Sequence, residues 1–245
     1  MTSPFGNVYE DAQRAAAYAQ LEYPGTYFLA FRDLPELIRA HVRGRRALDF
    51  GCGAGRSTRF LQQLGFETMG VDISAPMLEQ ARARDPRGDY RLVPDGDLSS
   101  LPPESFDLVL SAFTFDNVPT QERKVALLRA LGGLLTKDGC FVNLVSAPEI
   151  YLHEWASFST KDYPENRAAR DGERVRIVML DVPDRRPVED VLCTAEAWTA
   201  IQRDSGLVPL QTHRPLGRSD EPFAWVSETR IAPWRITVLA RNQPC

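Results

Sequence analysis

Short apolar runs alternate with amphipathic stretches through the middle of the chain. The strand-like runs are residues 46–50, 67–71, 90–93, 106–110 and 140–145. The segments between them carry the three-to-four-residue spacing of helices. A near-continuous apolar run such as 106–110 is typical of a central parallel strand, which is buried on both faces. Strands that alternate with helices predict a parallel sheet with right-handed crossovers.

The first 43 residues are expected to form helices that lie over one end of this sheet as a lid. Asn7 with Glu10 three residues later is typical of a capping box. Pro24-Gly25 interrupts the helical pattern, and Asp33 is a candidate cap for a second helix. The segment is rich in aromatic residues, which either pack the helices onto the sheet or face a ligand.

The alternation stops after the fifth predicted strand. Residues 147–193 are too many for a plain connection. They contain two β-like runs, 175–182 and 188–193, which predict a hairpin over the ligand-facing end of the sheet. The remaining residues, 194–245, are expected to supply one more helix and two closing strands.

Composition sets broad limits on the kind of protein. The 245 residues are 43% hydrophobic and 25% charged, as in ordinary globular proteins. The net charge is −4 without a basic block, which disfavours binding to nucleic acid. There is no apolar run of spanning length and no leader-like start, so we expect a cytoplasmic protein with no membrane partner. The four cysteines lack C-x-x-C spacing and are expected to be reduced thiols.

The most specific stretch is the turn Asp49-Phe50-Gly51-Cys52-Gly53-Ala54-Gly55, which follows the first predicted strand. Glycines permit positive φ and a close approach of the backbone to a ligand. The N–H groups at the start of the next helix can hold a polar or anionic group. An ordinary tight turn is the alternative. A dinucleotide fingerprint would have a third glycine where Arg56 stands, so an NAD enzyme is disfavoured.

Together with the acids downstream, this turn resembles the first motif of class I S-adenosylmethionine (SAM)-dependent methyltransferases. The resemblance covers roughly residues 44–146, with a weaker match of the last two strands, and is greatest to bacterial small-molecule enzymes of the methyltransferase type 11 kind. It implies an α/β, Rossmann-like seven-stranded sheet in the order 3-2-1-4-5-7-6, with the last strand antiparallel, N-terminal helices and a β-hairpin inserted after strand 5. It implies a single domain, 1–245, made of a helical lid (1–43), the SAM-binding core, a substrate-side insertion (147–193) and a terminal helix and hairpin (194–245).

The resemblance places SAM, the expected cofactor, at the carboxyl ends of the first four strands. Asp72, at the tip of the second strand, would accept hydrogen bonds from two ribose hydroxyls. Asp97 would accept the adenine amino group, and Asp49 would reach the methionine amino group; a helix cap and a loop aspartate are the alternatives for Asp72 and Asp97. The expected cofactor contacts are Asp49, Gly51, Gly53, Gly55, Asp72, Ile73, Asp97, Leu98, Ser111 and Ala112.

Candidate residues for the methyl acceptor follow strands four and five. A sulfonium methyl is already activated, so alignment is the chief requirement, and a base helps when the nucleophile must lose a proton. The expected catalytic groups are His153, Asp116 and Tyr151, with His153 favoured because its ordinary pKa lies near neutrality; a surface histidine is the alternative. Substrate contacts are expected from Tyr9, Tyr27, Arg32, Asn117, Glu154 and Trp155. No metal site is expected.

The function that follows is in-line transfer of a methyl group to nitrogen or oxygen, or to carbon, of a small metabolite. Two alternatives stay open. One is a SAM-fold enzyme that performs chemistry other than methyl transfer, and the other is a non-catalytic SAM-binding subunit. The sequence assigns no oligomeric state.

The cofactor assignment predicts that S-adenosylhomocysteine raises the melting temperature, because it binds the native state. Asp72→Ala should weaken this binding by at most a few kcal/mol, roughly the cost of a lost charged hydrogen bond. His153→Ala should leave it intact. A thermal shift titration measures all three proteins, and the reverse pattern in the two variants would overturn both role assignments.

Overall fold

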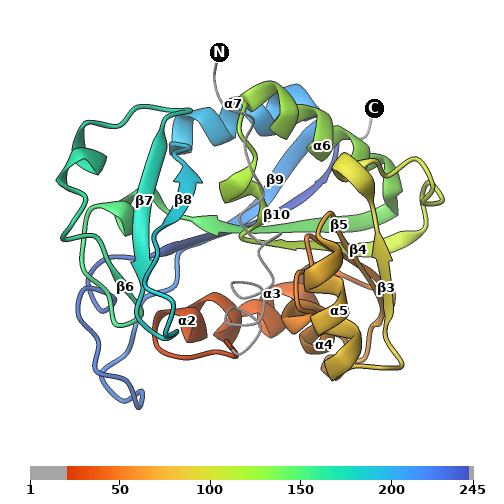
Figure 1. The fold of residues 1–245 in the computed structure, drawn as a ribbon. Helices are drawn as coiled ribbons and strands as arrows, with labels where there is room; N and C mark the ends of the chain where they lie inside the picture. Colours follow the sequence, from red (N-terminus) through yellow and green to blue (C-terminus); the bar gives the residue numbers. More distant parts are fainter. Residues whose placement is uncertain (1–20, 243–245) are drawn as a thin grey trace.

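The computed structural model describes residues 21–242, and its centre is a seven-stranded sheet in the order β3-β2-β1-β4-β5-β10-β9. Figure 1 shows this sheet edge-on between two layers of helices. The strands are β1 (Arg46–Phe50), β2 (Glu67–Asp72), β3 (Asp89–Leu92), β4 (Phe106–Ala112), β5 (Leu135–Ser146), β9 (Leu207–His213) and β10 (Trp234–Arg241). β1 to β5 pair in parallel, and β10 is antiparallel to β5 and β9. The predicted sheet order and its antiparallel last strand are confirmed.

Helices cover both faces of the sheet, because its central strands are apolar on both sides. α2 (Thr26–Arg32), α3 (Leu34–His41), α4 (Arg56–Gln63) and α5 (Ala75–Arg84) lie below the sheet in Figure 1, and α6 (Gln121–Leu134) and α7 (Ala195–Ser205) lie above it. In β4, Leu108 and Leu110 pack in the core on the α2–α4 side, whereas Val109 packs with α6 and α7. Alternate residues of β4 therefore pack into the two hydrophobic cores on opposite faces of the sheet.

Three of the described helices begin with a side-chain cap, whereas the cap expected at Asp33 is not formed. Side chains of Ser74, Thr120 and Thr194 cap α5, α6 and α7. Asp33 was expected to cap α3, but its side chain makes no capping hydrogen bond. Its carboxylate instead pairs with Arg32, which draws it away from the helix end. The predicted capping box at Asn7 and Glu10 lies outside the described residues.

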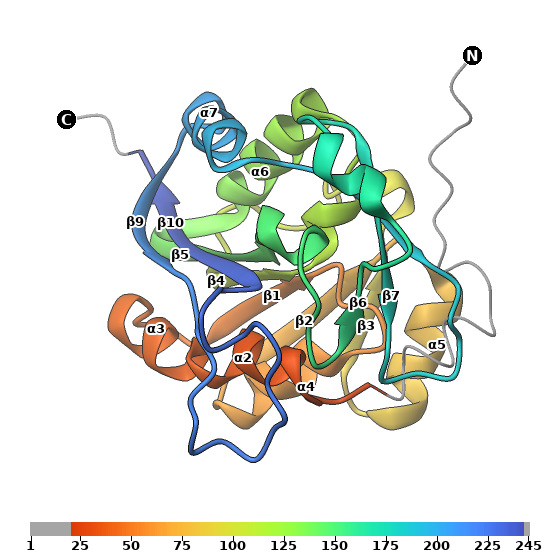
Figure 2. The ribbon, with the colours of Figure 1, turned by 90° about the vertical axis from the view of Figure 1, so that its left-hand side faces the viewer.

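The insertion after β5 contains the expected hairpin. β7 (Arg174–Met179) and β8 (Val188–Val191) pair antiparallel, and the short β6 (Phe158–Ser159) adds to β7. Two short 3-10 helices also belong to the insertion. η4 (Pro148–Tyr151) precedes β6, and η5 (Pro164–Ala168) lies between β6 and β7. β8 packs against η3 (Thr114–Asn117), the turn that follows β4. The insertion thus stands beside the carboxyl ends of the parallel strands, as Figures 1 and 2 show.

One buried carboxylate joins three segments that are far apart in the sequence. Glu228 is fully buried in the loop between β9 and β10, which Figure 2 shows beside α2. Its Oε1 accepts hydrogen bonds from Thr26 Oγ1 and from the Ala156 N–H, both at 2.7 Å. Its Oε2 accepts from the N–H groups of Val226 (2.8 Å) and Ser227 (3.1 Å). α2, the insertion and the C-terminal loop are therefore held together by one side chain.

Glu228→Ala should lower the free energy of unfolding by about 3 kcal/mol or more, because it leaves several buried donors without a partner. Glu189→Ala is the matched control. That residue pairs with Arg174 at the surface, at 3.3 Å, and such a pair contributes at most about 1 kcal/mol. Urea unfolding measures both, and equal losses in the two variants would contradict the role of Glu228.

Candidate functional site

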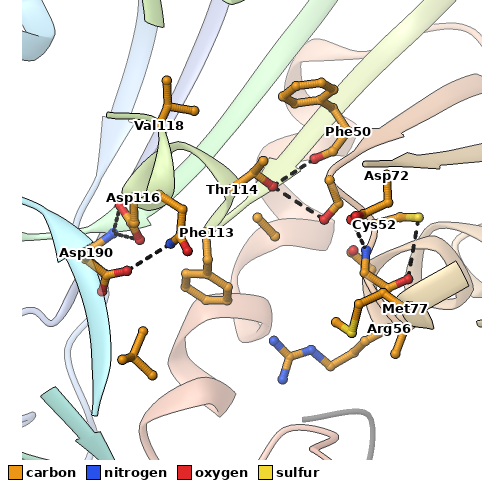
Figure 3. A pocket seen from close by; sticks show the side chains of 18 of the residues that line it. Phe50, Cys52, Arg56, Asp72, Met77, Phe113, Thr114, Asp116, Val118 and Asp190 are labelled. Carbon is orange, nitrogen blue, oxygen red and sulfur yellow. Dashed lines mark hydrogen bonds between the residues drawn. The ribbon is translucent and has the colours of Figure 1, made fainter. Parts of the chain in front are cut away.

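A cavity of about 430 Å³ opens at the carboxyl ends of β1, β2, β4 and β5. Its floor comes from the loops after these strands, and its roof from α2 and the insertion. β1 and β4 are neighbours in the sheet although the chain runs first to β2 and β3, and such a switch point is where open α/β sheets bind ligands. The volume suits a small molecule. Figure 3 shows the side chains of a part of the residues that line it.

The turn after β1 requires its glycines. Gly51, Gly53 and Gly55 have φ angles of 71°, 52° and 79°, a region that residues with a Cβ rarely adopt. A Cβ on Gly51 would lie 2.1 Å from Thr114 Oγ1, which donates a hydrogen bond to the Phe50 carbonyl at 3.0 Å. Gly51 and Gly53 line the cavity, so bare backbone faces its interior.

Asp49 is fully buried at the end of β1 and has one oxygen without a partner. Its Oδ2 accepts hydrogen bonds from Ser57 Oγ at 2.7 Å and Thr58 Oγ1 at 2.6 Å. Its Oδ1 has no hydrogen-bond partner within residues 21–242. Burial raises the pKa of Asp49 to about 6, against the opposing hydroxyl hydrogen bonds. A buried acceptor without a donor costs free energy, so this oxygen has the capacity to accept one further hydrogen bond.

Asp72 joins the loops after β1 and β2. Its Oδ2 accepts the Gly53 N–H at 2.8 Å, a contact drawn in Figure 3, and its Oδ1 accepts the Ser74 N–H at 2.8 Å. Burial raises its pKa, while these backbone hydrogen bonds oppose the shift. Each carboxylate oxygen can accept a second hydrogen bond, so Asp72 can also receive ligand hydroxyls. Beside it Ile73 lines the cavity with 47% of its surface exposed, an apolar contact for a ring.

Two buried carboxylates meet at the opposite end of the cavity. Figure 3 shows Asp116 on η3 and Asp190 on β8 side by side. Both are 7% exposed. Asp190 accepts hydrogen bonds from Tyr151 Oη at 3.0 Å and Asn117 Nδ2 at 2.9 Å. Both oxygens of Asp116 accept from the Ser146 N–H, at 3.2 and 3.1 Å. β4, β5 and the insertion therefore bring their acidic and polar groups to one point.

This pair is electrostatically unusual. Burial, together with the negative charge of Asp190, raises the pKa of Asp116 to about 8. Hydrogen bonds from the Ser146 side chain and from its N–H, and the Lys124 ammonium, act in the opposite direction. Lys124 is itself 2% exposed, and burial lowers its pKa. At neutral pH the two carboxylates consequently retain a proton between them, as like-charged groups in one site do.

An arginine and several aromatic rings form one wall. The Arg56 guanidinium carbon lies 4.9 Å from the Tyr27 ring centroid and 5.3 Å from that of Phe31. Phe113, whose centroid is 6.0 Å from the same carbon, has a φ of 66°. A positive φ is a genuine outlier for a bulky residue, and such strain concentrates at functional sites. Arg56 and Phe113 both line the cavity.

The structure brings about half of the expected site residues to the cavity surface. Those that line it are Tyr27, Gly51, Gly53, Asp72, Ile73, Ala112, Asp116, Asn117 and Tyr151. Asp49, Gly55, Leu98 and Ser111 are buried but do not line it. Asp97 is exposed, and its carboxylate accepts the Ser99 N–H at 2.9 Å.

The remaining expected contacts take part in local packing instead. Arg32 forms ion pairs with Asp33 and Glu221. Glu154 accepts hydrogen bonds from Thr160, and the buried Trp155 donates to the Ile150 carbonyl. His153 packs edge-on against Trp155, with centroids 6.2 Å apart. None of these four predicted residues lines the cavity. Tyr9 lies outside the described residues.

Among the lining residues outside the expected set, three are chemically notable: Asp190, Arg56 and Phe113. Asp190 had a sequence signal, because it is an acid at an inward position of the apolar run 188–193. Arg56 follows the last glycine of the turn. In the sequence it stands out only because a dinucleotide-binding fingerprint would have glycine at that position. Phe113 has no local signal.

No group of three or more His, Cys, Asp or Glu within the described range 21–242 is placed to hold a metal ion. In the same range no helix has the length and apolar character needed to cross a bilayer.

Similarity to known sequences is concentrated in the core. Residues 48–143 match the model of the family described as "Methyltransferase domain". A ubiquinone biosynthesis O-methyltransferase of Neisseria meningitidis is 31% identical over 122 residues, which are 46% of this chain and 50% of that protein. A cypemycin N-terminal methyltransferase of a Streptomyces species is 38% identical over 148 residues, 56% of this chain and 60% of that protein. The chain thus spans about half the length of the curated relatives it matches.

Similarity in structure extends further than similarity in sequence. The crystal structure of a SAM-dependent methyltransferase from Mesorhizobium loti aligns with 86% of this chain and 98% of its own, with a TM-score of 0.61 at 23% identity. At that identity the likeness concerns the fold, including the regions outside the family match.

The raised pKa of Asp116 predicts a pH-dependent stability. Its folded-state pKa of about 8 lies above the ordinary 3.8, so the native state binds this proton more tightly than the unfolded state does. The resulting stability is fully present below about pH 4 and is lost as the pH rises from 4 to 8. Asp116→Asn cannot ionise and should melt at least a few degrees higher than the parent protein at pH 8, with a smaller difference at pH 5. Asp138→Asn, an exposed control on β5, should show no such trend. A difference independent of pH would refute the assignment.

Proposed function

Because the chain belongs to the class I SAM-dependent methyltransferases, we propose that it transfers the methyl group of SAM to a nitrogen or oxygen of a small metabolite. The predicted family and its SAM cofactor are confirmed by the comparisons. The acceptor and the activity of the whole protein are inferred from the cavity.

The residues at the glycine end of the cavity fit the cofactor. The unpartnered Oδ1 of Asp49 suits an amino group such as that of the methionine moiety. Asp72 suits a pair of vicinal hydroxyls, and the exposed Ile73 suits a planar ring. Bound SAM supplies an electrophilic methyl group, and these side chains would hold and orient it. The role of Asp97 as an adenine partner has less support, since its carboxylate accepts the Ser99 N–H.

The observation that carries the proposal is that one cavity contains both the glycine turn and the buried acid pair. A cofactor site at one end and a proton acceptor at the other are the two parts that methyl transfer to N–H or O–H requires. Asp116 and Asp190 would receive the proton of the nucleophile, while Tyr151 and Asn117 hold Asp190 in place. His153, outside the lining, is a weaker candidate for the base.

The names of the relatives agree with an acceptor whose methylated atom is oxygen or nitrogen. One is an O-methyltransferase of ubiquinone biosynthesis, and the other acts at the N-terminus of cypemycin. A metabolite-sized acceptor is supported by the volume of the cavity. A non-catalytic subunit would have no need of a proton acceptor with a raised pKa, and transfer of labelled methyl separates a SAM-fold enzyme with other chemistry. The single-domain organisation and the cytoplasmic location remain predictions.

Incubation with methyl-labelled SAM and a panel of small amines and phenols should move label into product. Asp116→Asn should lower kcat/KM by about 10²–10⁴-fold, the usual contribution of a base, without weakening S-adenosylhomocysteine binding. For the parent protein, kcat/KM should rise with pH and level off above about 8, because the base must be unprotonated. Asp138→Asn should match the parent. Full activity of Asp116→Asn, or a profile that is flat from pH 6 to 9, would exclude the pair as the base.

A further inference from the structure

Resting on this proposed function, we infer that the methyl acceptor is an elongated apolar molecule that carries its nucleophilic nitrogen or oxygen at one end. Its body lies along the inward face of the β7–β8 hairpin, and its nucleophile reaches the Asp116–Asp190 pair where that face ends. The side chains that the hairpin turns toward the cavity carry this inference.

The hairpin places a continuous apolar surface beside the acid pair. Val188 lies two residues from Asp190 on β8, and side chains two positions apart in a strand share a face at a separation of about 7 Å. Val188 pairs with Ile177 of β7, and Met179, two residues further along β7, pairs with Phe158 of β6. All five line the cavity. The surface therefore runs from the acid past one apolar pair to a second.

The charged residues of the hairpin lie on its other face. On β7, Arg174 pairs with Glu189 of β8 at 3.3 Å, and Arg176 pairs with Glu165 of η5. None of these four residues lines the cavity. The alternation of the strand thus keeps their charges away from the surface that faces the ligand.

The acid pair is the polar end of this surface. Among the described residues of the insertion that line the cavity, only Asp190 and Tyr151 have a polar side chain, and Tyr151 Oη donates to Asp190 at 3.0 Å. An N–H or O–H of the acceptor finds a carboxylate there. A polar group beside Ile177 or Met179 would instead lose its hydrogen bonds to water without replacement, which costs free energy.

Aromatic rings extend the apolar wall at the end away from the acids. Trp234 and Tyr27 stack with ring centroids 5.9 Å apart, and the Phe158 centroid lies 5.7 Å and 5.0 Å from theirs. The Trp234 indole N–H donates to the Thr26 carbonyl at 2.8 Å, and the Tyr27 O–H donates to Met179 Sδ at 3.3 Å. Both donors are directed at protein atoms, so the rings offer the acceptor mainly apolar contact area.

The test is calorimetric titration of the full chain, saturated with S-adenosylhomocysteine at pH 7, with three matched probe pairs. Within each pair, a methyl group at the end remote from the nucleophile is replaced by a hydroxyl of similar size. The pairs are 4-butylphenol with 4-(3-hydroxypropyl)phenol, 4-butylaniline with 4-(3-hydroxypropyl)aniline, and hexylamine with 5-aminopentan-1-ol. In at least one pair the apolar member should bind about tenfold or more tightly, because an apolar pocket rejects an added hydroxyl by up to roughly a hundredfold.

A variant of the surface tests whether the hairpin causes this preference. Met179→Gln places an amide of similar length in the wall and should reduce the preference by about threefold or more, because the amide can hydrogen-bond the hydroxyl. Leu180→Gln is the matched control, since Leu180 is the next residue, is 38% exposed and does not line the cavity. It should keep the preference of the parent protein. If thermal melting shows that Met179→Gln does not fold, Ile177→Thr with Leu180→Thr as its control replaces the pair of variants.

A smaller preference in every probe pair, tighter binding of the hydroxyl member, or no binding of any probe would overturn the inference. The same follows if the cavity variant and its control keep equal preferences. If S-adenosylhomocysteine still raises the melting temperature in those cases, methyl transfer to a polar acceptor survives. Failure of S-adenosylhomocysteine to bind would instead overturn the proposed function, and the apolar acceptor with it.

Discussion

The burial of carboxylates at one edge of the sheet is the constraint on which the site depends. Asp49, Asp72 and Asp116 end or follow strands whose carboxyl ends meet there, and Asp190 reaches the same edge from β8 of the insertion. Taking a carboxylate out of water is costly unless donors or a proton compensate. Asp72 meets this requirement with backbone N–H groups and thereby joins two loops. Asp49 meets it incompletely, because its Oδ1 has no hydrogen-bond partner within residues 21–242, and the Asp116–Asp190 pair meets it in part by keeping a proton.

The lid over this edge is held by interactions that are themselves buried. The insertion carries Asp190 to Asp116, and the Glu228 carboxylate fixes the insertion to α2 and the C-terminal loop. α2 in turn supplies Tyr27 and Phe31 to the wall around Arg56. Regions outside the family match thus complete a cavity whose floor belongs to the core. This division agrees with a cofactor that the relatives share and a methyl acceptor that is particular to this chain.

Local signals in the sequence predicted the fold well. Alternating apolar runs gave the strands, and Ser74, Thr120 and Thr194 stand at the helix starts that they cap. The glycine turn was predictable because positive φ selects glycine position by position. Asp33 failed as a cap because a neighbouring arginine competes for its carboxylate.

The acceptor side was less predictable because it is assembled from distant segments. His153 has a suitable ordinary pKa but packs on Trp155, and no local pattern reports that orientation. Asp190 becomes chemically distinctive only beside Asp116, which is 74 positions earlier in the numbering. The most direct test of the account is a carbon-13 NMR titration of the aspartate side-chain carboxyls, with Asp116→Asn used for assignment. The account predicts a coupled titration of Asp116 and Asp190 with an apparent midpoint near 8. Titration of both carboxyls below pH 5 would contradict it.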